Sequence, residues 1–295
     1  MTKKDKAVIA LGYFDSVHNG HKKVISAAKD AATKLGVKCV VFSFDGDVKG
    51  ALGLSDGKCV FTIKERDELI KSLGADEIFY APVSKEFLAL GGEEFLDYVT
   101  NVYDVLCFVS GEDYTFGRGG ICGVKRLKEY AVAHDISVVT VSELRLNGQK
   151  VSTTAVKTLL SEGKVKSAAE MLGGAYFISG KVIRDRGEGR KMGFPTVNII
   201  PDAEKSKLKN GVYKGHVFLD KRYSAIINYG ARPTFGLNDL LVETHIIGYD
   251  GDLYGENIKV YFDDYLRDIK KFSSEEELKA QLKKDKAHAQ EGMYD

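Results

Sequence analysis

The sequence ALGYFDSVHNGHKKV, residues 10–24, places two histidines three positions apart directly after an apolar run. The run Val8–Leu11 predicts a short strand, and the amphipathic pattern of Gly20–Leu35 predicts a helix, so the stretch between them is a strand-to-helix turn. In an open parallel α/β sheet, ligands bind at the carboxyl ends of the strands, near the point where the strand order reverses. We therefore expect His18 and His21 to lie where such a sheet binds its ligand.

The alternation of strand and helix continues to about residue 160. Further strands are predicted at Val37–Phe44, Glu77–Tyr80, Val105–Val109 and Ile136–Val141. Further helices are predicted at Lys64–Leu73, Gly92–Asn101 and Gly123–His134. Alternating strands and helices form right-handed crossovers and a parallel sheet that is covered on both faces. Residues 1–160 are therefore predicted to form an α/β domain with a Rossmann-like parallel sheet.

Strand-like runs dominate the chain from residue 176 onward. They are Tyr176–Ile183, Gly211–Leu219, Tyr223–Tyr229, Leu241–Tyr249 and Asn257–Phe262. The next helical pattern is SSEEELKAQLKKD, residues 273–285, which opens with a Ser/Glu capping box. Residues 176–295 are therefore predicted to form a small antiparallel β-barrel with a C-terminal helix. The helical pattern of Thr154–Leu172 predicts that residues 161–175 are a helical linker between the two domains.

The composition argues against several classes of protein. With 43 Lys and Arg against 42 Asp and Glu in 295 residues, nothing favours a nucleic-acid or membrane partner electrostatically. No apolar run approaches the roughly 18 residues that span a bilayer, and the N-terminus lacks a signal-peptide cleavage pattern. The four cysteines form no CxxC pair and are predicted to be small buried thiols. We expect a cytoplasmic monomer or weak homo-oligomer.

The histidine pair allows a metal site, a helix face that carries two histidines, or a phosphate-binding turn. A zinc site would need further ligands, and none of the four remaining histidines or four cysteines is arranged to supply them. Gly12 permits a sharp turn, and Gly20 opens a helix whose free amide groups attract anions. Imidazoles at that point can donate to phosphate oxygens and stabilise charge on pentavalent phosphorus. The pattern favours phosphate chemistry.

A second candidate site lies in GKVIRDRGEGRKMGFPTVNI, residues 180–199. Its glycine-rich loop carries basic side chains, so its backbone amides can approach phosphates, although a plain hairpin loop fits the same pattern. Thr196 and Asn198 are alternate residues on an extended segment and point to the same side. Their neutral oxygens suit Mg²⁺ shared with the phosphates of ATP.

These segments resemble one known family along nearly the whole chain. GYFDSVHNGH, residues 12–21, resembles the G-x-F-D-x-x-H-x-G-H signature of the nucleotidyltransferase superfamily. SGEDYTFGRGG (110–120) and VSTTAVKTLL (151–160) resemble later motifs of its bacterial bifunctional riboflavin kinase and FMN adenylyltransferase branch. GRKMGFPTVN (189–198) resembles the riboflavin kinase motif, and NGVYKG, INYGARPTFG, VETHII and GDLYGENIKVYFDDYLRDIKKF follow in the family's order.

The resemblance implies that the N-terminal domain is a nucleotidyltransferase that transfers AMP from ATP to FMN and releases pyrophosphate. His18 and His21 would hold the ATP phosphates, and the FMN phosphate would attack the α-phosphate directly. Positioning and charge neutralisation would then supply the catalysis. The other nucleotide-binding residues implied in this domain are Gly12, Phe14, Asp15, Gly20, Ser152, Thr153 and Thr154.

The resemblance also implies that the C-terminal domain phosphorylates riboflavin with ATP and Mg²⁺. Glu243 would be the general base that takes the proton of the ribityl 5′-hydroxyl, whereas a lone strand glutamate would ordinarily lie on a solvated face. Asn228 and Arg267 would contact the flavin, and Thr196 and Asn198 would bind the metal. His245 lies on the same strand face as Glu243 and receives no role. The nucleotide-binding residues implied here are Gly187, Gly189, Arg190, Lys191, Gly193 and Pro195.

Three positions of the N-terminal domain depart from the family pattern. Phe44-Asp45-Gly46-Asp47 replaces the usual Phe-x-Pro-His-Pro segment, Gly120 stands where a basic residue is expected, and Ala155 stands where an arginine is usual. These changes leave an alternative open. The chain would then be a monofunctional riboflavin kinase, with an N-terminal domain that is degenerate or serves as a nucleotide- or flavin-binding regulatory module.

Overall fold

The chain divides into two compact units, Met1–Ala155 and Val156–Asp295. The structure, a computed structural model, describes residues 4–184, 189, 193–231 and 240–290. The predicted division at residues 160 and 175 stays a prediction.

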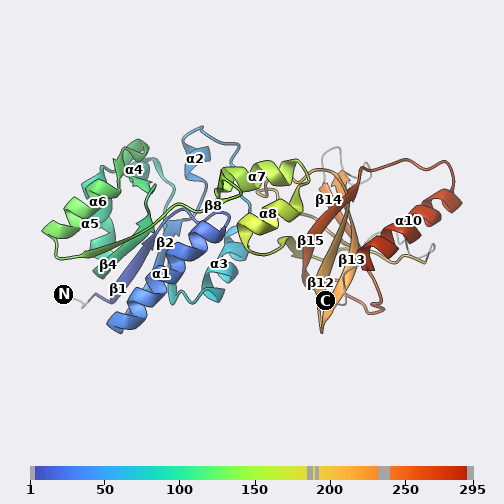
Figure 1. Ribbon diagram of the computed structural model, residues 1–295, viewed down its shortest axis with the longest axis horizontal. Helices are drawn as coiled ribbons and strands as arrows, with labels where there is room; N and C mark the ends of the chain where they lie inside the picture. The colour runs from blue at the N-terminus through green and yellow to red at the C-terminus, as the bar shows by residue number, and fades with distance from the viewer. Residues whose placement is uncertain (1–3, 185–188, 190–192, 232–239, 291–295) are drawn as a thin grey trace. The chain divides into compact units, whose positions relative to one another are not determined.

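The N-terminal unit is built on five parallel strands in the order β3-β2-β1-β4-β7, of which Figure 1 labels the central three. They are β1 (Lys6–Leu11), β2 (Lys38–Phe44), β3 (Glu77–Ala81), β4 (Asp104–Gly111) and β7 (Ser137–Val141). From β1 the chain proceeds to one edge of the sheet, and at β4 it returns to the other side of β1. The strand order therefore reverses between β1 and β4, and the predicted parallel α/β fold is confirmed.

Helices cover both faces of this sheet. The larger ones are α1 (Asn19–Leu35), α3 (Ile63–Ser72), α5 (Gly92–Val102) and α6 (Val124–Ala133). Val8 and Ala10 of β1 pack with Ile25 of α1, whereas Ile9 packs with Leu96 of α5 on the opposite face. Because both faces are buried, the strands read as continuous apolar runs. The shorter elements are α2 (Val48–Ala51), α4 (Lys85–Leu88), β5 (Thr115–Phe116), η1 (Arg118–Gly120), β6 (Cys122–Gly123), β8 (Arg145–Leu146) and β9 (Gln149–Lys150).

The C-terminal unit is a six-stranded antiparallel barrel in the order β10-β15-β12-β13-β14-β11. Its strands are β10 (Tyr176–Lys181), β11 (Val197–Ile199), β12 (Gly211–Phe218), β13 (Arg222–Ala231), β14 (Leu240–Ile246) and β15 (Asn257–Arg267). A bridge between Ile183 and Asn198 brings the two edges of the sheet together. The rings of Tyr213 and Phe262 lie 5.2 Å apart in the buried aromatic interior. The predicted barrel is confirmed, although the sequence did not reveal the short strand β11.

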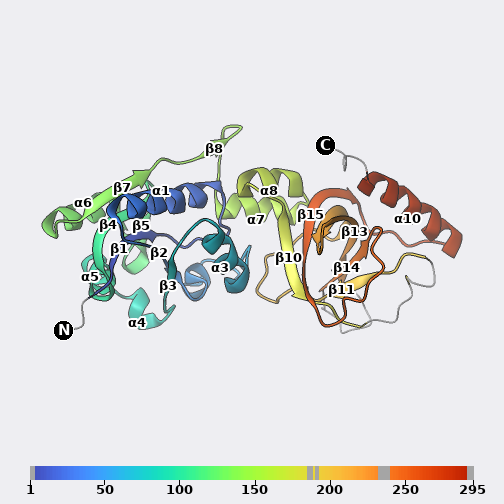
Figure 2. The ribbon, with the colours of Figure 1, turned by 90° about the horizontal axis from the view of Figure 1, so that it is seen from below.

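Helices α7 (Thr153–Ser161), α8 (Val165–Leu172) and α10 (Glu275–Gln290) lie among the described residues of this unit. The predicted helical stretch 154–172 consists of α7 and α8, separated at Gly163, whose φ of 78° no helix accommodates. Helix α10 lies against β12 and β13 on the outside of the barrel (Figure 2). Its Ala289 packs with Val212 and Ile226 there. The outer face beneath α10 is therefore partly shielded from water.

The remaining expectations concern cysteines and membrane spans. All four cysteines are free thiols, with Cys39 and Cys107 buried as predicted and Cys59 and Cys122 half-buried. In the described ranges, no helix is both long and apolar enough for a membrane span.

Candidate active sites

The turn after β1 has a strained backbone that packing holds in place. Phe14 and Val17 adopt φ values of 52° and 42°, which non-glycine residues rarely adopt, and both side chains are buried. A β-carbon on Gly12 would lie 2.7 Å from the Phe14 ring, so only glycine admits the ring there. The buried Asp15 carboxylate accepts a hydrogen bond from the backbone N–H of Val60 at 2.9 Å. The turn is thus tied to a second loop and preorganised.

His18 and His21 meet at the start of α1. His18 is the N-cap, and its Nδ1 accepts a hydrogen bond from the backbone N–H of His21 at 3.1 Å. The two imidazoles stack with centroids 3.7 Å apart, and Phe14 lies edge-on to His21 at 5.2 Å. A β-carbon on Gly20 would lie 3.1 Å from the His18 ring, so this glycine gives the ring room to fold over the helix end. The predicted histidine pair at a helix N-terminus is therefore present.

Both histidines are neutral at physiological pH. Burial lowers the pKa of His18 to about 4. The pKa of His21 lies well below its usual value because of burial, then repulsion from His18 when that ring is protonated, then the charge of Arg66. Since Nδ1 of His18 is an acceptor, the neutral ring carries its proton on Nε2. His18 thus offers an Nε2–H donor beside the free amide groups of α1.

The Ser/Thr motif reaches the same turn. The hydroxyls of Ser16 and Thr153 lie 2.9 Å apart, which joins residues 137 positions apart in sequence. Ser152 caps α7, since its Oγ accepts a hydrogen bond from the backbone N–H of Ala155 at 3.2 Å. Thr154 lies in the first turn of α7. The structure therefore brings the two predicted nucleotide-binding segments of this unit together.

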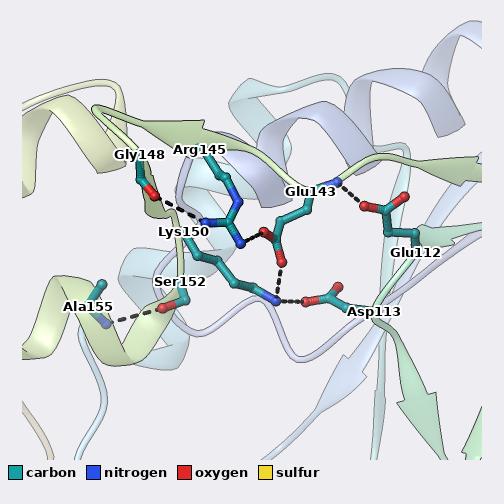
Figure 3. A network of polar contacts seen from close by, with 8 residues as sticks. All are labelled: Glu112, Asp113, Glu143, Arg145, Gly148, Lys150, Ser152 and Ala155. Carbon is teal, nitrogen blue, oxygen red and sulfur yellow. Dashed lines mark hydrogen bonds and ion pairs between the residues drawn. The ribbon is translucent and has the colours of Figure 1, made fainter.

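A network of ion pairs positions the Ser/Thr motif, and the sequence reasoning missed it (Figure 3). Lys150 contacts Asp113 at 2.5 Å and Glu143 at 2.8 Å, and Arg145 contacts Glu143 at 2.8 Å. These contacts join the β8–β9 hairpin, which precedes Ser152, to the loop after β4. The hydrogen bonds that Lys150 donates to Asp113 and Glu143 raise its pKa, so it stays protonated. The available signal was the pairing of charges around the short hairpin LNGQ at 146–149.

The three departures from the family pattern have local explanations. Gly120 has a φ of 67°, which disfavours any residue with a side chain there. Asp47 caps α2 and accepts a hydrogen bond from the Tyr13 hydroxyl at 3.3 Å, so it stabilises the segment beside the turn. Ala155 contributes only its backbone N–H to the Ser152 cap.

In the barrel, the predicted kinase residues lie in one row across neighbouring strands. Glu243 of β14 is paired with Asn198 of β11 on one side and with Asn228 of β13 on the other. The row continues from Asn228 to Val212 of β12 and then to Arg267 of β15. Directly paired residues of antiparallel strands share a face. These residues therefore lie on the outer face, opposite the aromatic interior.

Side chains in this row and from the adjoining Thr196 converge on the Glu243 carboxylate. The hydroxyl of Thr196 donates to Oε1 at 3.2 Å, and Nδ2 of Asn228 contacts Oε2 at 3.5 Å. Asn198 is buried and Glu243 is half-buried, so the carboxylate lies at the boundary between protein and solvent. The structure brings together the predicted base, both predicted metal ligands and one predicted flavin contact.

His245 supports the same cluster, although the sequence assigned it no role. Its Nδ1–H donates to the carbonyl of Pro195 at 2.8 Å, and its ring lies edge-on to Phe194. Burial is the main cause of its lowered pKa, so the ring is neutral. His245 thus fixes the peptide that precedes Thr196.

The described part of the glycine-rich loop is also close to Thr196. A β-carbon on Gly189 would lie 2.4 Å from the Phe194 carbonyl, and Gly193 has a φ of 80°. Both glycines are therefore required by the backbone. Gly187, Arg190 and Lys191 lie outside the described residues.

Arg267 is held by a partner that the sequence reasoning missed. Its guanidinium donates through Nε and Nη2 to both carboxylate oxygens of Asp285 of α10, with the Nη2–Oδ2 distance at 2.7 Å, and the Asp285 side chain is 2% exposed. Gln281 donates to the same carboxylate at 2.8 Å. Asp285 lies four residues before the buried Ala289 and so shares the packed face of α10 with it. A charged residue on that face was the signal in the sequence that could have indicated a buried ion pair.

The two sites define the class of the protein. One unit presents neutral donors at the switch point of a parallel sheet, and the other presents a carboxylate among neutral oxygens on a barrel. These are features of an enzyme with two phosphate-transfer sites, one in each unit.

Comparison with known proteins specifies the family. A family model described as FAD synthetase matches residues 1–155, and one described as riboflavin kinase matches residues 172–293. The bifunctional riboflavin kinase/FMN adenylyltransferase of Bacillus subtilis is 30% identical, covering 96% of this chain and 92% of that protein. Its Escherichia coli K12 counterpart is 27% identical over 98% of this chain and 93% of that protein. The chain belongs to the bifunctional riboflavin kinase/FMN adenylyltransferase family.

A solved structure supports the fold over both units. A crystal structure described as a macrolide-efflux protein from Streptococcus pneumoniae superposes with a TM-score of 0.88 at 30% identity. The superposition covers 97% of this chain and 94% of that protein.

Proposed function

We propose that this chain phosphorylates riboflavin to FMN in its C-terminal unit and adenylylates FMN to FAD in its N-terminal unit. The convergence of Thr196 and Asn228 on Glu243 is the observation that carries the kinase half. Both halves match their own family model, and this favours two activities over a monofunctional kinase. We propose further that the protein acts in the cytoplasm as a monomer or weak homo-oligomer.

In the kinase site, Glu243 takes the proton of the ribityl 5′-hydroxyl as that oxygen attacks the γ-phosphorus of ATP. Hydrogen bonds from Thr196 and Asn228 orient the carboxylate so that one lone pair faces the hydroxyl. The proton moves from the hydroxyl to Glu243, the bond from the γ-phosphorus to the bridging oxygen breaks, and ADP departs. The Arg267–Asp285 pair stabilises the strand end that would contact the flavin.

Mg²⁺ is the metal that we propose for this site. Thr196 and Asn198 present hydroxyl and amide oxygens beside the Glu243 carboxylate, and hard oxygens are what Mg²⁺ prefers. Oδ1 of Asn228 is also buried, with no hydrogen-bond partner among the described residues. Bound Mg²⁺ would neutralise charge on the ATP phosphates.

In the N-terminal site, the FMN phosphate attacks the α-phosphorus of ATP, and pyrophosphate leaves. The Nε2–H of His18 and the free amide groups of α1 donate to the phosphate oxygens. Ser16 and Thr153 hold the start of α7 beside the turn, so that Ser152 and Thr154 approach the phosphates from the other side. No residue of the chain forms a covalent intermediate.

A time course of flavins tests the proposed function. The full chain is incubated with riboflavin, ATP and Mg²⁺, and the flavins are separated by chromatography. We expect FMN first and FAD after it. FMN that accumulates without FAD, even with enzyme in excess, would contradict the adenylyltransferase half.

A further inference from the structure

One buried cation in the N-terminal unit has no part in the function described so far. Arg66 of α3 is 3% exposed. Its Nη1 donates to the carbonyl of Tyr13 at 3.1 Å, and its Nη2 donates to the carbonyl of Phe44 at 2.9 Å. Tyr13 lies in the turn after β1, and Phe44 ends β2. Arg66 therefore joins the carboxyl ends of two adjacent strands, at the edge where the nucleotide is proposed to bind.

The charge of Arg66 has no anionic partner in the described part of the chain. Its guanidinium donates to two neutral carbonyls and to the Tyr80 hydroxyl, which is bonded to Asp67, and its Nε is buried without a hydrogen-bond partner there. The guanidinium carbon also lies 5.7 Å from the Tyr13 ring centroid and 5.1 Å from that of Tyr80. A buried charge is costly unless something compensates it. An anionic ligand at this edge would provide that compensation.

The position of Arg66 relates it to the histidine turn. Its positive charge is one of the causes that lower the pKa of His21, so its field reaches the proposed phosphate site. The two imidazoles are neutral and supply hydrogen bonds without net charge. A fixed cation is therefore what the turn itself lacks.

We propose that Arg66 is a positioning residue that supplies a fixed positive charge for the triphosphate of ATP while it holds the ends of β1 and β2 together. The inference rests on the adenylyltransferase function proposed above. It also accounts for Ala155, because a cation from α3 offsets the arginine that the family usually carries at that position. The guanidinium acts through its field and through the backbone of the turn.

The test separates the charge of Arg66 from its hydrogen bonds in the full chain. Arg66→Lys keeps the charge but loses the guanidinium that donates to two carbonyls at once. Arg66→Gln keeps an amide donor but loses the charge. In FAD formation from FMN, we expect R66Q to raise the KM for ATP by about 10- to 100-fold and R66K to raise it by only about threefold. FMN formation by the same variants should not change. Arg126→Gln, which removes an exposed arginine of α6, is the matched control and should match the unmodified chain.

Calorimetric titration with a non-hydrolysable ATP analogue and Mg²⁺ gives a readout independent of turnover. The unmodified chain should bind two equivalents, and R66Q should weaken one of them at least tenfold. If the unmodified chain makes no FAD but R66Q still weakens one site, the proposed function fails and the inference stands. If the unmodified chain makes FAD and R66Q binds and turns over as well as R66K, the inference is wrong. Equal losses in R66Q and R66K would also overturn it, because the charge would then not matter.

Discussion

The two sites of this chain are built in opposite ways. The N-terminal site rests on one continuous turn, residues 12–21, whose glycines, strained backbone and helix end arrange neutral imidazoles and amide groups. The central residues of the C-terminal site, Asn198, Asn228 and Glu243, come instead from three strands and meet through their register. A contiguous loop can be recognised from its sequence alone. A site formed by register depends on the whole barrel.

The largest expected effect tests the independence of the two sites. Glu243→Gln removes the proton acceptor but keeps the shape of the side chain, so FMN formation should fall by roughly 10³- to 10⁴-fold. FAD formation from supplied FMN should be unchanged. Asp263→Asn, which removes a carboxylate bound to His216 elsewhere on the barrel, is the control. Retained FMN formation in E243Q would mean that the base is another group.

The second prediction concerns how much the buried Arg267–Asp285 ion pair stabilises the C-terminal unit. Asp285→Ala leaves the guanidinium of Arg267 largely buried without its partner, which should destabilise the C-terminal unit by about 3–5 kcal/mol. Circular dichroism during urea unfolding measures this loss. Glu275→Gln removes an exposed pair with Lys279 on the same helix and should cost under about 1 kcal/mol. Equal stability of the two variants would show that the Arg267–Asp285 pair contributes little.

The third prediction concerns the phosphate donor of the turn. His18→Asn keeps an N-cap acceptor for the backbone of His21 but removes the Nε2–H donor. FAD formation should fall about 10²- to 10³-fold, while FMN formation stays constant. Chromatography of both flavins measures the two rates in one sample. A variant with unchanged FAD formation would show that the turn binds phosphate through its backbone alone.

The smallest effect is a pH dependence of the stability of the N-terminal unit. The pKa of His18 is about 4 in the fold against 6.5 in the unfolded chain, so the unfolded state binds the proton more tightly. The stability is therefore fully present above about pH 6.5 and decreases towards pH 4, by about 2–3 kcal/mol from His18. Urea unfolding at pH 7.5 and 4.5 checks this, and His18→Asn should show a smaller decrease. An equal decrease in the variant would assign the pH dependence to other groups.

The sequence predicted the helices and strands well because its apolar residues follow the helical and the strand periodicity clearly. All five strands of the parallel sheet and the main helices of that unit fall within a few residues of their predicted bounds. The strand β11 was missed because three residues are too few to show alternation. The break at Gly163 was missed because its flanking patterns are both helical.

Two of the residues that escaped prediction, Arg66 and Asp285, share one property. Arg66 and Asp285 are charged residues on buried helix faces, each four positions before a buried Ile70 or Ala289. Arg66 donates to two backbone carbonyls, and Asp285 binds an arginine. These partners come from distant parts of the chain, so no local sequence pattern reveals them. The roles of Gly187, Arg190 and Lys191 stay predictions, because these residues lie outside the described ranges.

Complementation tests most directly the claim that each unit contains its own complete site. Glu243→Gln and His18→Asn are assayed separately and then mixed, with riboflavin, ATP and Mg²⁺. The account predicts that E243Q makes FAD only from supplied FMN, that H18N stops mainly at FMN, and that the mixture makes FAD from riboflavin. Loss of both activities in either variant, with its fold intact, would contradict two independent sites.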